Sequence, residues 1–244
     1  MPNGLNILCQ HSMRIAGFQP CSLSDFPGKV ASIVFTQGCP FACGYCHNPG
    51  LIPTKPGVYT VQDIIERLTQ RRMFIDGVVI TGGEPTVQPD LPDFLRKIRN
   101  IGIEIKLDTN GVHPKMIETL VKERLVDFFA MDIKHRFDKY EDVVGEVGPA
   151  VKELCQKTMD YIISSGVAYE FRTTTDAGIH TLEDIATISA QLPRGARYAL
   201  QALRREKTYK SDLPQQTMAV GEFLAICKEH IKTARPDIHL IIRA

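Results

Sequence analysis

Strand-like and helix-like segments alternate along most of this 244-residue chain, and that alternation limits the folds it can adopt. Apolar, β-branched runs predict six strands, over residues 30–36, 77–81, 103–107, 126–133, 168–174 and 197–200. Amphipathic segments predict helices over 60–68, 91–100, 114–123, 150–164, 182–191 and 220–233. A strand–helix alternation of this kind forms a parallel sheet with helices packed outside it.

The number of repeats decides how far such a sheet can close. Six clear strand–helix units fall short of the eight in a closed (β/α)8 barrel, so we expect an α/β fold with an open, partial (β/α)6 barrel. No repeat, low-complexity tract or linker divides the sequence, which predicts a single domain over residues 1–244. Within it we expect an irregular N-terminal extension at 1–28, the barrel core at 29–204, and at 205–244 a last helix with a short seventh strand at 238–242.

Composition excludes several classes of protein. The chain is 43% hydrophobic, and its 29 Lys and Arg residues nearly balance its 28 Asp and Glu residues, so charge implies neither nucleic acid nor an anionic membrane as a partner. No apolar stretch approaches the roughly 18–20 residues of a membrane helix, and residues 1–15 do not resemble a signal peptide. Seven cysteines, an odd number with four dispersed, suit a reducing compartment. We therefore expect a cytoplasmic protein.

Three cysteines lie within eight residues directly after the first predicted strand, at Cys39, Cys43 and Cys46. Three soft ligands that close together can hold one soft metal centre. A four-iron cluster usually takes four thiolates. Three thiolates would therefore leave one iron free to bind a substrate.

Other interpretations compete on spacing alone. Residues 43–47 match the c-type haem attachment pattern, Cys43 and Cys46 could form a redox dithiol, and His47 could complete a three-Cys, one-His zinc site. The cysteines could also be inert buried thiols. Haem attachment would need export, for which residues 1–15 show no signal, and a dithiol leaves Cys39 unexplained. Zinc is the main alternative, although no second zinc knuckle is present.

Polar motifs follow the other predicted strands where each strand ends. They are Gly82-Gly83-Glu84-Pro85, Asp108-Thr109-Asn110-Gly111, Asp132-Ile133-Lys134 and Arg172. Sites in α/β sheets and barrels are built at the carboxyl ends of the strands. We therefore expect these residues to meet the cysteines at one mouth of the barrel.

The cysteine spacing, with the aromatic Tyr45 just before the third cysteine, resembles the signature of the radical S-adenosylmethionine (radical SAM) enzymes. Gly17-Phe18, residues 24–29 and Cys46-His47-Asn48-Pro49 narrow the resemblance to the glycyl-radical activating enzymes. Within them it is greatest to the branch that activates anaerobic ribonucleoside-triphosphate reductase. The resemblance covers about residues 17–204.

This resemblance implies one [4Fe–4S] cluster held by Cys39, Cys43 and Cys46, whose open iron chelates S-adenosylmethionine. Reductive cleavage would give methionine and a 5′-deoxyadenosyl radical, with no catalytic residue beyond the cluster and that cofactor. The implied partners are reduced flavodoxin or ferredoxin as electron donor and the large subunit of anaerobic ribonucleotide reductase, whose backbone glycine becomes a radical. The alternatives are another glycyl-radical partner, a small-molecule enzyme similar to 7-carboxy-7-deazaguanine synthase, or a non-catalytic zinc or iron–sulfur module.

The resemblance also assigns the residues around S-adenosylmethionine. Tyr45 would lie beside the adenine, with backbone of Cys46 and His47 touching the base. Gly82, Gly83 and Glu84 would face the methionine amine, and Glu84 could either accept from that ammonium or orient the backbone. Only residues 49–59 separate the cysteine loop from the first helix, which leaves no room for a ferredoxin-like insertion and predicts a single cluster.

Charged residues complete the expected site. In related activases, positions matching Asp108, Asp132 and Lys134 contact S-adenosylmethionine or a monovalent cation, whose ligands would be the aspartate oxygens. Arg172 could hold a carboxylate, and Gln201 could lie on the ribose side, where Leu203 stands in place of an aromatic residue. Each has a structural alternative: a packing role for Tyr45, solvated turns for the aspartates, and a structural ion pair for Arg172.

Overall fold

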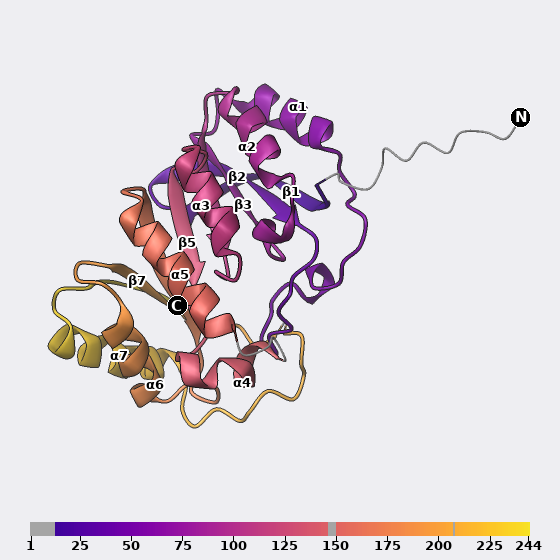
Figure 1. The fold of residues 1–244 in the computed structure, drawn as a ribbon. Helices are drawn as coiled ribbons and strands as arrows, with labels where there is room; N and C mark the ends of the chain where they lie inside the picture. The colour runs from indigo at the N-terminus through magenta and orange to yellow at the C-terminus, as the bar shows by residue number, and fades with distance from the viewer. Residues whose placement is uncertain (1–12, 146–149, 207) are drawn as a thin grey trace, which may run out of the picture.

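The computed structural model describes residues 13–145, 150–206 and 208–244. They form one eight-stranded sheet in which each strand lies beside the next in sequence (Figure 1). The strands are β1 (Ile15–Phe26), β2 (Lys29–Thr36), β3 (Gly77–Gly82), β4 (Glu104–Thr109), β5 (Phe128–Asp132), β6 (Ala168–Thr175), β7 (Arg197–Ala202) and β8 (His239–Arg243). Strand β1 runs antiparallel to β2, and all later neighbours are parallel.

Helices connect the parallel strands and lie outside the curved sheet (Figure 1). They are α1 (Val61–Arg71), α2 (Leu91–Arg99), α3 (Pro114–Lys122), α4 (Tyr140–Val144), α5 (Val151–Ser164), α6 (Leu182–Gln191) and α7 (Val220–Ala234). Three 3₁₀ turns, η1 (Pro49–Leu51), η2 (Pro85–Val87) and η3 (Phe137–Lys139), follow the ends of β2, β3 and β5. Helices α1 and α6 begin with capping boxes, in which Thr60 and Thr181 bond reciprocally with Asp63 and Asp184.

The sheet is open, as the sequence predicted. Its strand order runs from β1 to β8 without returning to β1, so these two strands form the edges of the sheet over the described ranges. The short strand expected at 238–242 is present as β8, parallel to β7. The barrel is therefore partial, because its two edge strands do not pair with each other.

Two expectations differ from the structure. The prediction of an irregular segment at 1–28 is wrong for β1, and residues 1–12 of that segment lie outside the described residues. Strand β1 contains Gly17 and Pro20, which weaken a strand pattern, and it tolerates them because it is an edge strand with register shifts. Helix α4 was not predicted, because five residues are too few to show helical periodicity.

The two faces of the sheet differ in chemistry. The outer face packs against the helices through a large hydrophobic core, to which α2 contributes Leu91, Phe94, Leu95 and Ile98. The inner face carries a smaller apolar group, formed by Phe26, Ala31, Ile33, Val79, Phe128 and Ala130. Because Phe128, Ala130 and Asp132 alternate on one face of β5, the inner face changes from apolar to charged toward the carboxyl end of that strand.

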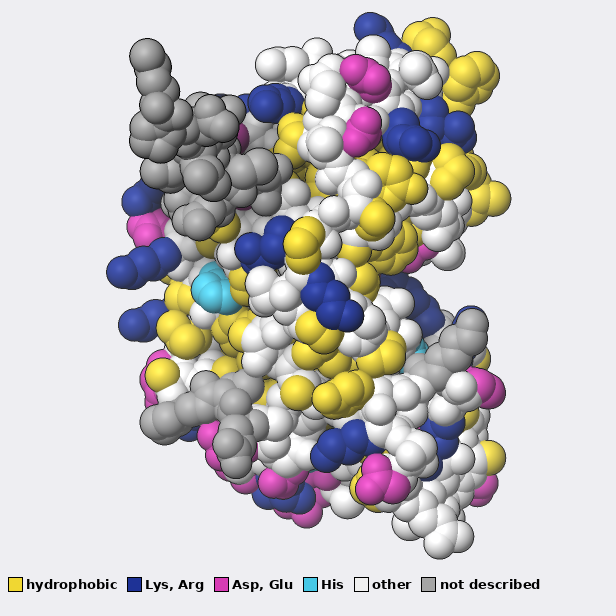
Figure 2. Space-filling view, turned by 90° about the vertical axis from the view of Figure 1, so that its right-hand side faces the viewer, with side chains coloured by type: hydrophobic (Ala, Val, Ile, Leu, Met, Phe, Trp, Pro, Cys, Tyr) yellow, Lys and Arg dark blue, Asp and Glu magenta, His cyan; other side chains and the backbone are white. Residues whose placement is uncertain are grey.

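The surface matches the balanced composition. On the face in Figure 2, Lys and Arg side chains are interspersed with Asp, Glu and hydrophobic side chains instead of forming one basic patch. Among the helices that the structure describes, none combines the length and apolar character needed to cross a bilayer.

Candidate active site

The cysteine loop leaves the carboxyl end of β2 and is held by backbone hydrogen bonds. Gly38 N donates to Leu51 O at 2.8 Å, Cys39 N to Ile52 O at 3.0 Å, and Cys46 N to Cys43 O at 3.0 Å. The buried Gln37 side chain donates to Gly50 O and Pro53 O, which ties the loop to η1. The residues between the cysteines are therefore fixed by local contacts on both sides.

The three thiols line one cavity of about 290 Å³ at the mouth of the barrel, which we call the site cavity. Burial raises the pKa of Cys39 to about 12 and that of Cys43 to about 11, so both are neutral thiols in the metal-free protein. Over the described part of the chain, no three His, Cys, Asp or Glu side chains are gathered around a single point suited to one ion. In a cluster each thiolate binds a different iron, so the sulfurs need not meet at one point. The arrangement is compatible with a cluster.

Gly82 and Gly83 press directly against the start of the cysteine loop. Gly82 has φ +113°, and a Cβ there would lie 2.4 Å from Thr36 N; a Cβ on Gly83 would lie 2.3 Å from Gly38 O. Gly83 N donates to Thr36 O at 2.9 Å, and Glu84 N to Gly38 O at 2.8 Å. Only glycine permits this backbone contact between the two loops.

Glu84 is buried, and its carboxylate connects the end of β3 to the end of β4. Its oxygens accept from Thr86 N at 3.1 Å, Thr86 Oγ1 at 2.5 Å, Thr109 Oγ1 at 2.8 Å and Asn110 N at 2.6 Å. The sequence left two roles for Glu84, binding the methionine amine or orienting the backbone. This geometry matches the second role. Asn110, which belongs to a polar motif predicted at this mouth but was given no role there, also points its side-chain amide at Cys39 Sγ, 3.9 Å away.

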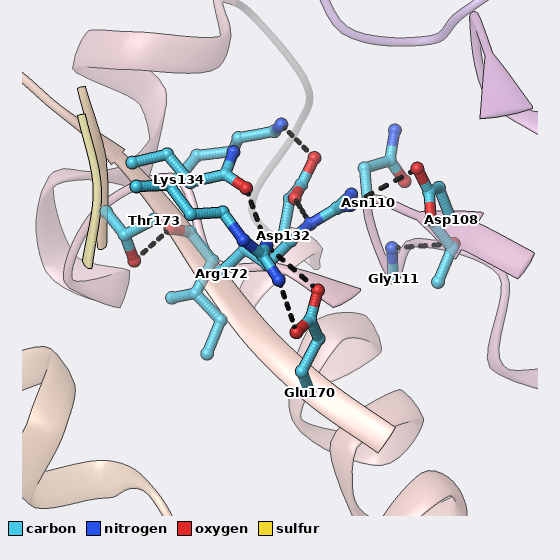
Figure 3. Close-up of polar contacts among 12 residues, drawn as sticks. Asp108, Asn110, Gly111, Asp132, Lys134, Glu170, Arg172 and Thr173 are labelled. Atoms are coloured by element: carbon cyan, nitrogen blue, oxygen red, sulfur yellow. Dashed lines mark hydrogen bonds and ion pairs between the residues drawn. The ribbon is translucent and has the colours of Figure 1, made fainter. Parts of the chain in front are cut away.

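Charged side chains from β4, β5 and β6 form the opposite side of the site cavity (Figure 3). We call Asp108, Asp132, Lys134 and Arg172, which line the cavity, together with Lys106, which lies behind Asp108, the charged wall. The Arg172 guanidinium lies between two carboxylates, with Nε 2.8 Å from Asp132 Oδ1 and Nη1 3.2 Å from Asp108 Oδ2. Lys134 Nζ is 2.7 Å from Asp132 Oδ2, and Lys106 Nζ is paired with Asp108 Oδ1.

This pairing fixes the protonation of the charged wall. Burial alone would raise the pKa values of Asp108 and Asp132, but Arg172 and the neighbouring lysines hold both below the ordinary value. Burial would likewise lower the pKa of Lys134, but Asp132 holds it above its ordinary value. These carboxylates and Lys134 are therefore ionised at neutral pH.

The remaining predicted residues also line the site cavity. The Tyr45 hydroxyl is buried without a hydrogen-bond partner, and burial raises its pKa well above the ordinary value. The exposed His47 has Nε2 3.0 Å from Arg204 O, and Gln201 Oε1 accepts from Arg243 Nη1 at 2.9 Å. All thirteen predicted residues line this cavity: Cys39, Cys43, Tyr45, Cys46, His47, Gly82, Gly83, Glu84, Asp108, Asp132, Lys134, Arg172 and Gln201.

A segment far along the chain covers the cysteine loop. Lys210 N donates to Gly44 O at 2.8 Å. The segment is anchored on Asp176, which is fully buried and accepts from Arg205 Nε at 2.8 Å and Gln216 Nε2 at 2.6 Å. Leu203 is buried and does not line the site cavity.

Comparison with known proteins identifies the family. The sequence model of the radical SAM superfamily matches residues 33–187. The chain belongs to the radical SAM superfamily. The provisionally named glycyl-radical enzyme activating enzyme MJ1227 of Methanocaldococcus jannaschii is 34% identical over 207 residues, 84% of this chain and 85% of that protein. The chain is therefore a radical SAM enzyme of the glycyl-radical activating family, as the sequence motifs predicted.

Two further proteins are similar to this radical SAM enzyme, one in part of its sequence and one in its fold. The pyruvate formate-lyase-activating enzyme of Clostridium pasteurianum is 33% identical over 140 residues, 54% of this chain and only 58% of that relative. SuiB of Streptococcus suis, solved with its precursor peptide SuiA, has the same fold, with a TM-score of 0.67 at 17% identity, over 87% of this chain and 48% of SuiB. At that identity the likeness concerns the fold alone.

Membership of the superfamily implies a [4Fe–4S] cluster and S-adenosylmethionine, and the site cavity fits both. Three thiols line it, whereas the other described cysteines, Cys21, Cys155 and Cys227, do not. The charged wall has three cationic and two anionic side chains, so one positive charge is left to attract a carboxylate. The Tyr45 hydroxyl remains free to contact a ligand.

Proposed function

We propose that this enzyme uses one [4Fe–4S] cluster and S-adenosylmethionine to generate a glycyl radical on anaerobic ribonucleoside-triphosphate reductase. The observation that supports the cofactor site is the meeting of three thiols, a glycine loop and the charged wall around one cavity. The reduced cluster would supply the electron that cleaves the sulfonium and yields the 5′-deoxyadenosyl radical. This chain's residues would hold and orient the reactants.

On one side of the site cavity, the chain would act mainly through thiols and backbone. Cys39, Cys43 and Cys46 would ligate three irons, and backbone carbonyls at Gly82 and Gly83 would accept hydrogen bonds from the methionine amine. Glu84 would keep that backbone in place, since its oxygens already accept four protein hydrogen bonds. Neutral backbone carbonyls suit the methionine amine, which must be unprotonated to bind an iron.

On the other side, Lys134 and Arg172 would face the methionine carboxylate. Asp132 bonds to both of them, so it fixes their orientation before the ligand arrives. Asp108 restrains the same guanidinium through a second ion pair, with Arg172 Nη1. The monovalent cation predicted at Asp108 and Asp132 is not part of this proposal, because both carboxylates are already paired with cationic side chains.

The adenosine would lie between the cysteine loop and β7. Tyr45 would contact the adenine, while the His47 ring is already bonded to Arg204 O, so His47 and Cys46 would contribute backbone. Gln201 uses its oxygen on Arg243, which leaves its amide N–H groups for a ribose hydroxyl.

The proposal of anaerobic ribonucleotide reductase as the partner rests on sequence motifs. Gly17-Phe18, residues 24–29 and Cys46-His47-Asn48-Pro49 resemble the branch that acts on anaerobic ribonucleotide reductase. An unclosed barrel is compatible with entry of a protein segment from the side. Reduced flavodoxin or ferredoxin would donate the electron.

Pyruvate formate-lyase is the second candidate target, since a relative that is 33% identical activates it. The test uses anaerobically reconstituted enzyme, S-adenosylmethionine and reduced flavodoxin with each purified target in turn. We expect electron paramagnetic resonance to detect a glycyl radical on the reductase. A radical on pyruvate formate-lyase alone would transfer the assignment to that partner.

Metal analysis tests the cofactor independently of the partner. We expect about four irons and four sulfides per chain, as in a [4Fe–4S] cluster. About one zinc per chain without sulfide would instead identify a structural or hydrolytic zinc site. That result would contradict the proposed chemistry altogether.

A further inference from the structure

Lys106 is one of the most buried charged residues of the chain. It lies on β4 with only 1% of its side chain exposed, opposite Val79 on β3 and Phe128 on β5. Both neighbours belong to the apolar group on the inner face of the sheet. An ammonium in such surroundings is costly unless a carboxylate and hydrogen bonds compensate it. Lys106 bonds to Asp108 Oδ1, which lies one step closer to the site cavity.

The aspartates that could bind a cation at the site cavity have no oxygen without a cationic partner. Asp108 bonds to Lys106 through Oδ1 and to Arg172 through Oδ2, the latter at 3.2 Å. Asp132 bonds to Arg172 at 2.8 Å and to Lys134 at 2.7 Å. A further cation at these oxygens would lie close to three positive side chains, which repel it.

We propose that the ammonium of Lys106 takes the place of a bound monovalent cation beside Asp108, so that the site holds S-adenosylmethionine without Na⁺ or K⁺. Lys106 stands behind Asp108 and compensates its charge from the barrel interior. Because Lys106 shares the negative charge of Asp108, Asp108 does not fully neutralise Arg172. The charged wall therefore keeps one positive charge that can attract the methionine carboxylate. Lys106 is thus a positioning residue that acts through Asp108 and Arg172.

The inference rests on the proposed cofactor site, and its first test is cation dependence in the reconstituted wild-type enzyme. S-adenosylmethionine binding is measured at constant ionic strength in potassium, sodium or choline chloride. We expect the same affinity in all three salts. An enzyme that binds the cofactor only when K⁺ or Na⁺ is present would overturn the proposal.

The second test removes the ammonium. Lys106→Met keeps much of the side-chain volume and leaves Asp108 short of one cation. We expect weaker cofactor binding in choline and recovery in KCl by about 5- to 150-fold, the usual range of coupling between two sites. Lys106→Arg keeps the charge and should remain independent of the salt. The exposed Lys97 on α2 provides the control, Lys97→Met, which should bind as the wild type does.

A third readout needs neither cluster nor cofactor. The melting temperature of iron-free Lys106→Met should rise when choline is replaced by K⁺ at constant ionic strength, while the wild type does not respond. A variant that shows no response to K⁺ in melting or in binding would contradict the inference. A wild type that binds no S-adenosylmethionine in any salt would contradict the proposed function, and the melting experiment would still decide the role of Lys106.

Discussion

One side of the site cavity is formed largely by backbone, and the other side by charged side chains. On the β2–β3 side, Gly82 and Gly83 contact the cysteine loop through backbone, at places where a Cβ would lie within 2.4 Å of backbone atoms. On the β4–β6 side, the charged wall contacts the cavity through side chains that neutralise one another. The first side therefore depends on the absence of a side chain, and the second on the balance of charges.

This difference predicts how each side responds to change. Adding a single carbon on the glycine side forces backbone to move, whereas on the charged wall the sign and shape of a charge matter more than its volume. Substitutions of similar size should thus have unequal effects on the two sides, and the following experiments test that inequality.

The largest effect is expected from Cys43→Ala, which removes one of the three ligands. Cleavage of S-adenosylmethionine should fall to background because the cluster is lost, while circular dichroism and thermal melting stay near the wild type. Cys21→Ser, at an exposed position on β1, is the matched control and should keep full iron content. Loss of iron in that control, or in Cys155→Ala or Cys227→Ala, would contradict the three-ligand assignment.

The next largest effect is expected from Gly83→Ala on the glycine side. Its Cβ would lie 2.3 Å from Gly38 O, so the cysteine loop must shift. We expect the rate of cofactor cleavage to fall by about 100-fold, since small displacements of reacting groups have effects of that size. Gly50→Ala, whose Cβ would have no neighbour within 4 Å, should retain activity. Equal rates of cofactor cleavage in both variants would contradict the proposed difference between the two sides.

A smaller effect is expected from Arg172→Lys on the charged wall. The substitution keeps the charge but cannot contact Asp108 and Asp132 as a planar fork. Affinity for S-adenosylmethionine should fall by about tenfold, or ~1.4 kcal/mol, with iron content unchanged. Calorimetric titration measures this change, and Arg99→Lys, in the more exposed pair with Asp127, is the control. A loss of iron in Arg172→Lys would mean that the two sides are not independent.

The smallest effect concerns acid stability behind the charged wall. His180 Nε2 lies 3.0 Å from Lys134 O, and burial lowers the pKa of His180 to about 4. Between pH 6.5 and 4 the unfolded chain therefore binds a proton that the folded chain does not, so folding stability should fall as pH falls through this range. The slope contributed by His180 is at most about 1.4 kcal/mol per pH unit.

The measurement is denaturant unfolding of His180→Gln and wild type between pH 7 and 4. The variant should lose less stability on acidification, because its side chain does not titrate. The titratable groups that act on His180 are His135, Asp176 and Asp184. His239→Gln, at an exposed position on β8, controls for the loss of an imidazole. An unchanged slope in His180→Gln would show that another group governs acid stability.

Sequence periodicity was enough to predict the open barrel and the strand ends at which the site forms. Because carboxyl ends of parallel strands share one edge, residues as distant as Cys39 and Gln201 were expected to meet, and they line one cavity. Strand β1 escaped prediction because Pro20 and Gly17 break its pattern, and an edge strand can accommodate them.

Lys106 shows why part of the site could not be predicted. It occupies the polar position of an alternating strand, Ile103-Glu104-Ile105-Lys106-Leu107, where a lysine normally faces solvent. In a barrel that alternate face is the interior, so periodicity gives the correct direction but not the burial. The motif that contains Asn110 was expected at this mouth, but its contact with Cys39 Sγ was not, because that contact depends on the turn that Glu84 holds in place.

The cover formed at Lys210 over the cysteine loop has a consequence for biosynthesis. The thiols and the covering segment are separated by roughly 170 residues, so a ribosome adding about 5–20 residues per second makes Cys39 about 10–30 s before Lys210. The cover closes only after Gln216 has been made, when Asp176 can bind both Arg205 and Gln216. Newly made thiols thus stay accessible to the machinery that delivers iron and sulfide until the covering segment has been made.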